Sequence, residues 1–172
     1  MNDLSGPQLE APRDCFVDDD QLWFRLRSCL VVVRDGAVLM ARNSRDEFHY
    51  SVGGGVHHGE STLEAARREA LEETGVALEP RRLLFTHENF FPIGDRLAHE
   101  VAFYYLASDD PAIRTGEPTS ATADGVEEWL EWLPLADWGS GRPAYPTILP
   151  EVLDELAERG DAYVPKVLVT RE

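Results

Sequence analysis

The residues best suited to carry chemistry are three glutamates that lie close together in the sequence. Glu69, Glu72 and Glu73 are spaced at i, i+3 and i+4, so in a helix they share one face. Like charges at this spacing destabilise an exposed helix by roughly 0.2–0.5 kcal/mol per pair, and Arg68 alone cannot offset three carboxylates. A hard divalent cation such as Mg²⁺, Mn²⁺ or Ca²⁺ would remove this penalty. The alternative is a solvated acidic face on a surface helix.

Both ends of the helix that carries these glutamates are marked in the sequence. Ser61 can cap the first turn, and Glu64, three residues later, completes a capping box. Gly75 supplies the stop, because the residue that follows a helix often needs a positive φ. Three apolar side chains at helical spacing predict the buried face: Leu63, Ala66 and Ala70. The sequence therefore predicts an amphipathic helix between Ser61 and Gly75, directly after a loop with three consecutive glycines.

The stretch from residue 54 to 76 resembles the box motif of the Nudix hydrolase family. The motif is Gly, five residues, Glu, seven residues, Arg-Glu, an apolar residue, any residue, Glu-Glu, any residue, Gly and an apolar residue. Every defined position is filled in this chain, by Gly54, Glu60, Arg68, Glu69, Ala70, Glu72, Glu73, Gly75 and Val76. A weaker resemblance extends over roughly residues 25–140.

The resemblance implies a role for each matching residue. The three glutamates are expected to bind Mg²⁺ or Mn²⁺, and the backbone carbonyl of Gly53 is expected to add a ligand. Arg68 orients the glutamates in the family, and Glu60 pairs with that arginine. Glu69 and Glu73 are the first choices for essential catalytic residues, with Glu72 as a further metal ligand.

The general base is not decided by the sequence. It is Glu69, Glu73 or an acid outside the motif, and three such acids are candidates: Glu100, Glu127 and Glu128. Glu88 and Glu100 flank a predicted hairpin, and carboxylates at strand ends are usually solvated. Of the two, Glu100 is slightly favoured because it enters a strand predicted to be central, where a spare charge needs a reason. The resemblance places a further acid a few positions before Trp132, without choosing between Glu127 and Glu128.

Four residues are candidates for substrate contacts. Arg42 and Arg45 belong to a charged loop before the glycines and could meet phosphates, although solvated loop arginines are equally compatible with the sequence. Phe90 and Phe91 could stack on a base, although paired aromatic residues more often pack in a core. The polar segment 108–125 is long enough to close over a substrate.

The remaining pattern predicts an α/β fold, a Nudix-type α/β/α sandwich with a mixed β-sheet. Asp35-Gly36 predicts a hairpin. Strands are predicted at 23–26, 30–33, 38–41, 83–86 and 101–106, the last of them central. A closing helix is predicted at 151–159, between Pro150 and Gly160, and residues 164–169 predict an edge strand or a partner contact. We expect residues 1–20 to be loosely ordered and residues 21–172 to form a single Nudix hydrolase domain.

Composition limits the classes of partner. The 172 residues are 43% hydrophobic, which is typical of a globular protein with a real core. The net charge of −16 argues against binding to long nucleic acid or to an anionic membrane surface. Two cysteines, Cys15 and Cys29, do not make a disulfide framework. The first residues lack the basic flank and apolar run typical of a signal peptide, and no apolar stretch approaches the ~18 residues needed to span a membrane. We therefore expect a cytoplasmic protein with reduced thiols.

The resemblance implies a pyrophosphatase that hydrolyses a nucleoside diphosphate linked to another moiety. The substrate is a small nucleotide-type molecule, and a homodimer is compatible with the sequence. Sugar nucleotides, ADP-ribose, oxidised nucleoside triphosphates and dinucleoside polyphosphates all stay open. Two alternatives are a non-catalytic nucleotide-sensing module, which the intact carboxylate set disfavours, and an isoprenoid diphosphate isomerase. The isomerase would need a cysteine and a glutamate at the site, and Cys29 precedes a strand that is predicted to be buried.

Overall fold

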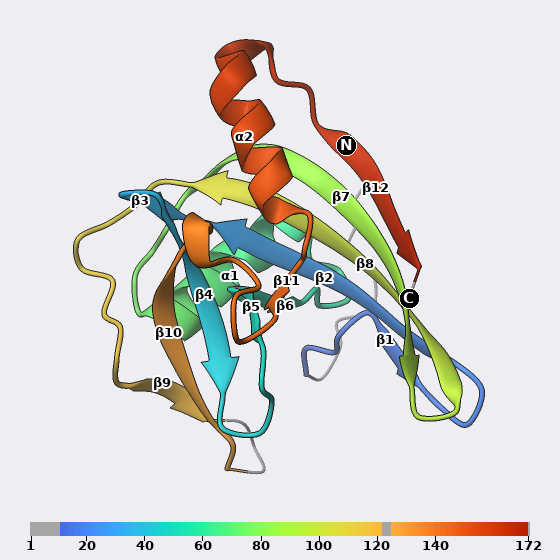
Figure 1. The fold of residues 1–172 in the computed structure, drawn as a ribbon. Coiled ribbons are helices and arrows are strands. Elements are labelled where there is room, and N and C mark those ends of the chain that lie inside the picture. Colours follow the sequence, from blue (N-terminus) through green and yellow to red (C-terminus); the bar gives the residue numbers. More distant parts are fainter. Residues whose placement is uncertain (1–10, 122–124, 172) are drawn as a thin grey trace, which may run out of the picture.

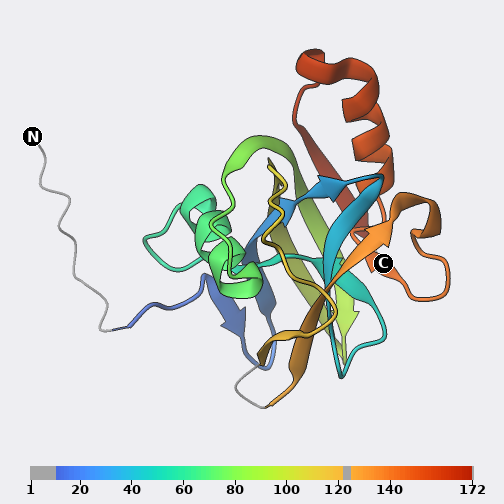
Figure 2. The ribbon, with the colours of Figure 1, turned by 90° about the vertical axis from the view of Figure 1, so that its left-hand side faces the viewer.

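The computed structural model describes residues 11–121 and 125–171. It contains two six-stranded sheets with parallel and antiparallel pairs, and its two α-helices pack on opposite sides of the strands (Figures 1 and 2). The helices are α1 (Thr62–Thr74) and α2 (Leu149–Arg159), and two short 3₁₀ turns span Leu135–Asp137 and Gly160–Ala162. The predicted α/β fold with mixed strand pairing is confirmed.

The first sheet carries the longest strands of the described chain. Its order is β1 (Phe16–Asp18), β2 (Trp23–Val31), β8 (Arg96–Ala107), β7 (Pro80–Ile93) and β12 (Lys166–Arg171), and β6 (Gly53–Gly55) pairs with β2. The pairs β2–β8 and β7–β12 are parallel, and the others are antiparallel. Strand β8 therefore lies between β2 and β7, which confirms that it is central.

The second sheet is built around the hairpin strand β4. Its order is β11 (Ala144–Tyr145), β5 (His49–Ser51), β4 (Ala37–Asn43), β10 (Glu127–Pro134) and β9 (Pro118–Ala121), and β3 (Val33–Arg34) pairs with β4. The predicted hairpin joins β3 to β4, because Asp35 and Gly36 both have positive φ, 48° and 76°, as a tight two-residue turn requires.

Alternation along β2 and β4 divides the buried side chains into two clusters. Cys29, Val31, Val38 and Met40 pack with Leu149, Val152 and Leu153 of α2. Leu30, Val32, Leu39 and Ala41 pack with Ala66 and Ala70 of α1. Since successive strand residues face opposite sides, the same strands supply both cores, and the result is a sandwich of helix, strands and helix.

Strand β2 is a single continuous strand, although the sequence predicts two separate strands at 23–26 and 30–33. Trp23–Val31 forms nine continuous strand residues, all of them paired with β8. The polar residues Arg27 and Ser28 interrupt the apolar pattern, yet both are buried and bonded to backbone carbonyls. The polarity therefore reflects tertiary hydrogen bonds and does not mark a break in the strand.

Helix α1 has the predicted ends. Ser61 accepts from the Glu64 N–H while the Glu64 carboxylate accepts from the Ser61 N–H, and Gly75 has φ 70°. Ala66 and Ala70 are fully buried, whereas Leu63 is only half-buried. Helix α2 begins at Leu149, two residues before the predicted start, and Gly160 follows its last residue.

Three segments outside the main elements also differ from or extend the predictions. Of the segment 1–20, which is expected to be loosely ordered, residues 1–10 lie outside the described part; within residues 11–20, β1 pairs with β2 and the Cys15 N–H donates to the Val56 carbonyl at 2.7 Å. The polar segment 108–125, which is long enough to close over a substrate, contains strand β9 and the buried Ile113, and its residues 122–124 lie outside the described part. The predicted edge strand near the C-terminus is confirmed as β12. No helix in the described ranges combines the length and hydropathy needed to cross a membrane.

The capping box at the start of α1 generates a stability prediction. We expect Ser61→Ala to lower the free energy of unfolding by about 1 kcal/mol, because the Glu64 N–H loses its side-chain acceptor. Urea unfolding measures the change. Ser140→Ala, at an exposed turn after β10, is the control, and an equal loss in both variants would contradict this account of the helix start.

Candidate active site

The carboxylates of α1 face the glycine strand β6 at close range. Glu73 accepts a hydrogen bond from the Gly53 N–H at 3.1 Å. A Cβ atom at Gly54 would collide with the Glu69 carboxylate, and one at Gly53, where φ is 132°, would collide with the backbone of Ser28. Glycine at position 53 therefore lets β6 lie close to β2, and glycine at position 54 leaves the space that the Glu69 carboxylate occupies. Glu69 is buried, and Glu73 is half-buried.

Arg68 connects three of the acidic residues. One of its terminal nitrogens donates to Glu69 at 2.6 Å and to Glu72 at 3.1 Å, and its Nε and other terminal nitrogen both donate to Glu60 at 3.0 Å. It also donates to the Gly55 carbonyl at 2.8 Å. Burial alone would raise the pKa of Glu60, but the hydrogen bonds from Arg68 and from the His57 N–H hold that pKa below its ordinary value. Arg68 is thus fixed against both the helix and the loop.

The two inner carboxylates resist ionisation. Desolvation raises the pKa of Glu73 to about 8, an effect that Arg27 opposes and the neighbouring Glu69 reinforces. Desolvation also raises the pKa of Glu69, although Arg68 opposes the shift. A nearby cation would stabilise the ionised form of two carboxylates that are shielded from water and lie close together.

The donors at this position fit a hard divalent cation by their chemistry. Three carboxylates on one helix face and a backbone carbonyl are oxygen ligands of the kind that Mg²⁺ and Mn²⁺ prefer. The carbonyl of Gly53 accepts from Arg27 at 2.8 Å, so this oxygen also serves a cationic side chain. Within residues 11–121 and 125–171, no three His, Cys, Asp or Glu side chains are already gathered around a common point. Arg68 lies against two of the glutamates and offsets part of their charge.

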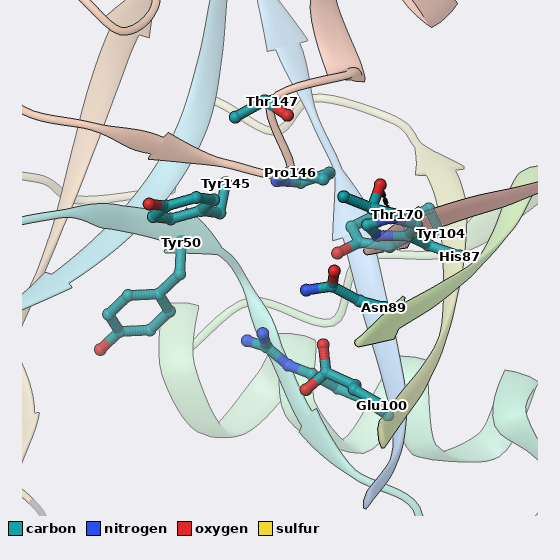
Figure 3. Close-up of a pocket in the computed structure, with 10 residues that line it drawn as sticks. Tyr50, His87, Asn89, Glu100, Tyr104, Tyr145, Pro146, Thr147 and Thr170 are labelled. Carbon is teal, nitrogen blue, oxygen red and sulfur yellow. Dashed lines mark hydrogen bonds between the residues drawn. The ribbon is translucent and has the colours of Figure 1, made fainter. Parts of the chain in front are cut away.

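A cavity of about 310 Å³ opens beside Glu73 and leads to a second one of about 340 Å³. The first is lined by Arg25, Arg27, Asn43, Asp46, Phe48, Tyr50, Gly53, Glu73 and Glu128. The second shares Arg25, Arg27, Phe48 and Tyr50 with the first. We call the two together the cleft. A smaller recess of about 50 Å³ continues from it, with Asn89 and Glu100 on one side and Tyr50 and Tyr145 on the other (Figure 3).

Two arginines that the sequence analysis missed lie at the middle of the cleft. Arg25 and Arg27 are two residues apart on β2, so both point to the same face of the sheet. Arg27 is only 8% exposed and donates to the carbonyls of Ser51 and Gly53, both at 2.8 Å, while its Nε is buried without a partner. Two basic residues at a spacing of two within an otherwise apolar strand are the signal that could have found them.

Aromatic side chains form two walls at the far end of the cleft. Trp23 and Phe91 come from the first sheet, and their ring centroids are 5.6 Å apart. Phe48 and Tyr145 come from the second sheet side, with centroids 5.5 Å apart, and Tyr50 lies next to Phe48 at 6.1 Å. The end of the cleft therefore presents aromatic surfaces from both sheets to whatever enters.

The structure separates the paired aromatic residues that the sequence proposed as substrate contacts. Phe91 lines the cleft. Phe90 points to the other face of β7, where it stacks on His99 at 4.3 Å and lies under Arg171 at 4.0 Å. Arg42 pairs with Glu131 and stands over the Trp129 ring at 4.6 Å, and Arg45 is an exposed loop residue. Neither of these arginines is among the residues that line the cleft.

The three candidate acids outside the motif have different surroundings. Glu128 lines the cleft together with Glu73 and accepts a hydrogen bond from the Tyr50 hydroxyl at 2.7 Å. Glu127, its neighbour on β10, is exposed. Glu100 is buried at the aromatic end, where it accepts from Arg25 Nε at 2.8 Å. Of the three, Glu128 is the one placed beside the α1 carboxylates.

Comparisons with known proteins were made for the sequence and for the fold. Residues 24–155 match the family model of the NUDIX domain. The fold is similar to a MutT NUDIX hydrolase from Burkholderia pseudomallei, with 29% identity and a TM-score of 0.57 over 74% of this chain and 95% of that one. It also resembles a MutT protein from Bacillus halodurans (22% identity, TM-score 0.54, 84% and 86% covered) and an ADP-ribose pyrophosphatase from Streptococcus suis (14%, 0.52, 83% and 98%). The search of curated proteins found no protein that matches this sequence.

The raised pKa of Glu73 generates a prediction for the metal-free protein. Between pH 4.5 and about pH 8 the folded state keeps a proton on Glu73 that the unfolded state has lost, so stability falls as pH rises through this window. We expect Glu73→Gln, which cannot ionise, to raise the free energy of unfolding at pH 9 in the presence of EDTA by about 1–3 kcal/mol, with no gain at pH 4.5. Urea unfolding across pH measures this, with Glu158→Gln on exposed α2 surface as control. Parallel pH curves for Glu73→Gln and the wild type would refute the prediction.

Proposed function

The chain belongs to the Nudix family of hydrolases, and from that membership we propose that it cleaves a phosphoric anhydride bond in a nucleoside diphosphate linked to another moiety, with Mg²⁺ or Mn²⁺. The observation that carries this proposal is the order of groups along the cleft. Carboxylates stand at one end, two arginines in the middle and aromatic walls at the other end. These groups complement a metal-bound diphosphate, its negative charge and a planar base in the same order.

In this proposal the metal is held by Glu69, Glu72 and Glu73, with the carbonyl of Gly53 as a fourth donor. A divalent cation at such a site neutralises phosphate charge and lowers the pKa of a bound water. Arg68 positions Glu69 and Glu72 through one shared nitrogen, and its bonds to Glu60 keep it there. Arg68 and Glu60 are therefore positioning residues, and their loss would misplace the carboxylates.

Arg25 and Arg27 are proposed to meet the diphosphate. The protein carries a net charge of −16, so an anionic substrate needs cationic groups inside the cleft. Arg27 is held rigidly by two carbonyls, and a guanidinium fixed in this way binds phosphate with little loss of side-chain entropy. Arg25 is closer to the aromatic end, against Glu100 and over Trp23 at 5.4 Å.

Glu128 is proposed as the general base. It shares the cleft with Glu73, and the Tyr50 hydroxyl donates to it, which fixes the orientation of its carboxylate. A base in this position can take a proton from a water that is held near the α1 carboxylates. Glu100 is less suitable because Arg25 occupies its Oε2 at the opposite end of the cleft.

The isomerase alternative receives no support from the position of Cys29. Its side chain is fully buried in the core, and burial raises the pKa of the thiol to about 11. A side chain enclosed in the core does not reach a substrate bound in the cleft, and Cys29 is not among the residues that line it. An assay of hydrolysis distinguishes an enzyme from the alternative, a nucleotide-sensing module without catalytic activity.

The first prediction concerns hydrolysis. We expect turnover of at least one compound in a panel of nucleoside diphosphate derivatives with Mg²⁺ or Mn²⁺, abolished by EDTA. Glu69→Gln should lower kcat by more than about 100-fold, beyond the 10–100-fold typical of residues that only support metal ligands. Glu79→Gln, an exposed carboxylate just after α1, is the matched control. Metal-independent turnover would refute the metal proposal, and nucleotide binding without turnover would favour the sensing module.

The second prediction separates two adjacent glutamates on β10. We expect Glu128→Gln to lower kcat by about 10²–10⁴-fold with a smaller change in KM, because the water loses its base. Glu127→Gln changes the same charge one residue away on the exposed face and should leave both parameters near wild type. A kcat for Glu128→Gln equal to that of Glu127→Gln would show that the base is another residue.

A further inference from the structure

Three polar side chains form a row beneath the aromatic walls of the cleft. In the register of the first sheet, Arg25 on β2 stands opposite Glu100 on β8, and Glu100 stands opposite Asn89 on β7. Arg25 donates to Glu100 Oε2, and both Glu100 and Asn89 line the aromatic cavity and the small recess behind it. Figure 3 shows Asn89 directly beside Glu100, with Tyr145 and Tyr50 across the recess. We call Asn89 and Glu100 the polar floor.

The polar floor contains groups whose hydrogen-bonding capacity is not used within the chain. The Oδ1 atom of Asn89 is buried and has no partner, and the same is true of Nε of Arg27, which borders both cavities. Glu100 is only 6% exposed. Buried polar atoms are nearly always paired, so an unpaired acceptor beside a buried carboxylate marks a position where a bound molecule can supply a donor.

We propose that the polar floor selects a nucleobase with an exocyclic amino group next to a ring nitrogen, that is, adenine in preference to its oxo counterpart hypoxanthine. This inference rests on the proposed function and names the substrate class of that site. An asparagine amide pairs with the amino group and ring nitrogen of adenine through its own oxygen and nitrogen. The aromatic residues on both sides, Trp23 and Phe91 against Phe48 and Tyr145, would stack on the faces of the same ring.

Glu100 gives the selection its direction. An asparagine amide can turn its nitrogen toward an oxo group, so alone it would tolerate either base. A carboxylate that forms an ion pair with an arginine acts as a hydrogen-bond acceptor, and Arg25 forms this pair by donating to Glu100 Oε2. A 6-oxo group at this edge would face the carboxylate with no hydrogen between them, whereas an amino group donates to it. Rejection of the oxo base therefore follows from a fixed acceptor and not from shape.

The test compares two ligands that differ only at this group. Isothermal titration of AMP and IMP without metal should show at least about tenfold tighter binding of AMP to the wild type. In Glu100→Gln, which keeps the shape of the side chain but can turn an amide nitrogen toward an oxo group, we expect the ratio of the two affinities to fall toward one. The ratio is the readout because damage to the fold weakens both ligands together. Glu100→Leu, which removes the carboxylate, repeats the comparison if the glutamine variant does not fold.

Each outcome decides the inference separately from the proposed function. Equal binding of AMP and IMP by the wild type, binding of neither, or an unchanged ratio in the Glu100 variants would overturn it. A parallel assay measures hydrolysis of ADP-ribose and its hypoxanthine analogue with Mg²⁺. Preference for AMP without hydrolysis would leave the polar floor standing and refute the catalytic proposal. Hydrolysis of both analogues at equal kcat/KM would refute the selection of adenine by the polar floor and leave the catalytic proposal standing.

Discussion

The contact between helix α1 and the glycine strand β6 is the constraint on which the rest of the cleft depends. On one side Glu69 and Glu73 reach the strand, and on the other the backbone of Ser28 in β2 leaves no room for a side chain at Gly53. The strand is thus held between a helix and a sheet at backbone distance. This arrangement moves two carboxylates away from water, and the raised pKa of each is the electrostatic consequence.

Strand β2 transmits this constraint to the other end of the cleft. It pairs with β6 in one direction and with β8 in the other, so its register fixes the glycine strand and Glu100 at the same time. Arg25 and Arg27 line the cleft, and Cys29 and Val31, which follow on the same face of β2, belong to the core beneath α2. A slip of one residue would exchange the two faces and remove both arginines from the cleft. The register of β2 therefore determines both the packing of the core and the position of the two arginines.

Features encoded by neighbouring residues were predictable from the sequence, and features that depend on register were not. The capping box at Ser61 and the turn at Asp35-Gly36 are local, and both are present as predicted. The continuity of β2 was hidden because Arg27 is satisfied by distant carbonyls. Phe90 and Phe91 were recognised as a pair, but only the pairing of β7 with β8 decides that Phe91 faces the cleft. The same holds for Glu128, whose place beside Glu73 follows from the pairing of β10 with β4.

The charge of the protein gives the cleft a further property. With a net charge of −16, the surface repels an anionic substrate at a distance, so long-range steering works against binding. Inside the cleft the balance changes. Arg25 is paired with Glu100, whereas Arg27 donates to two backbone carbonyls, which do not cancel its charge. An anionic substrate therefore gains attraction only at short range, from Arg27 and from a cation on the α1 carboxylates. Because screening weakens repulsion between exposed charges more than attraction at buried ones, added monovalent salt should assist entry more than it weakens binding within the cleft.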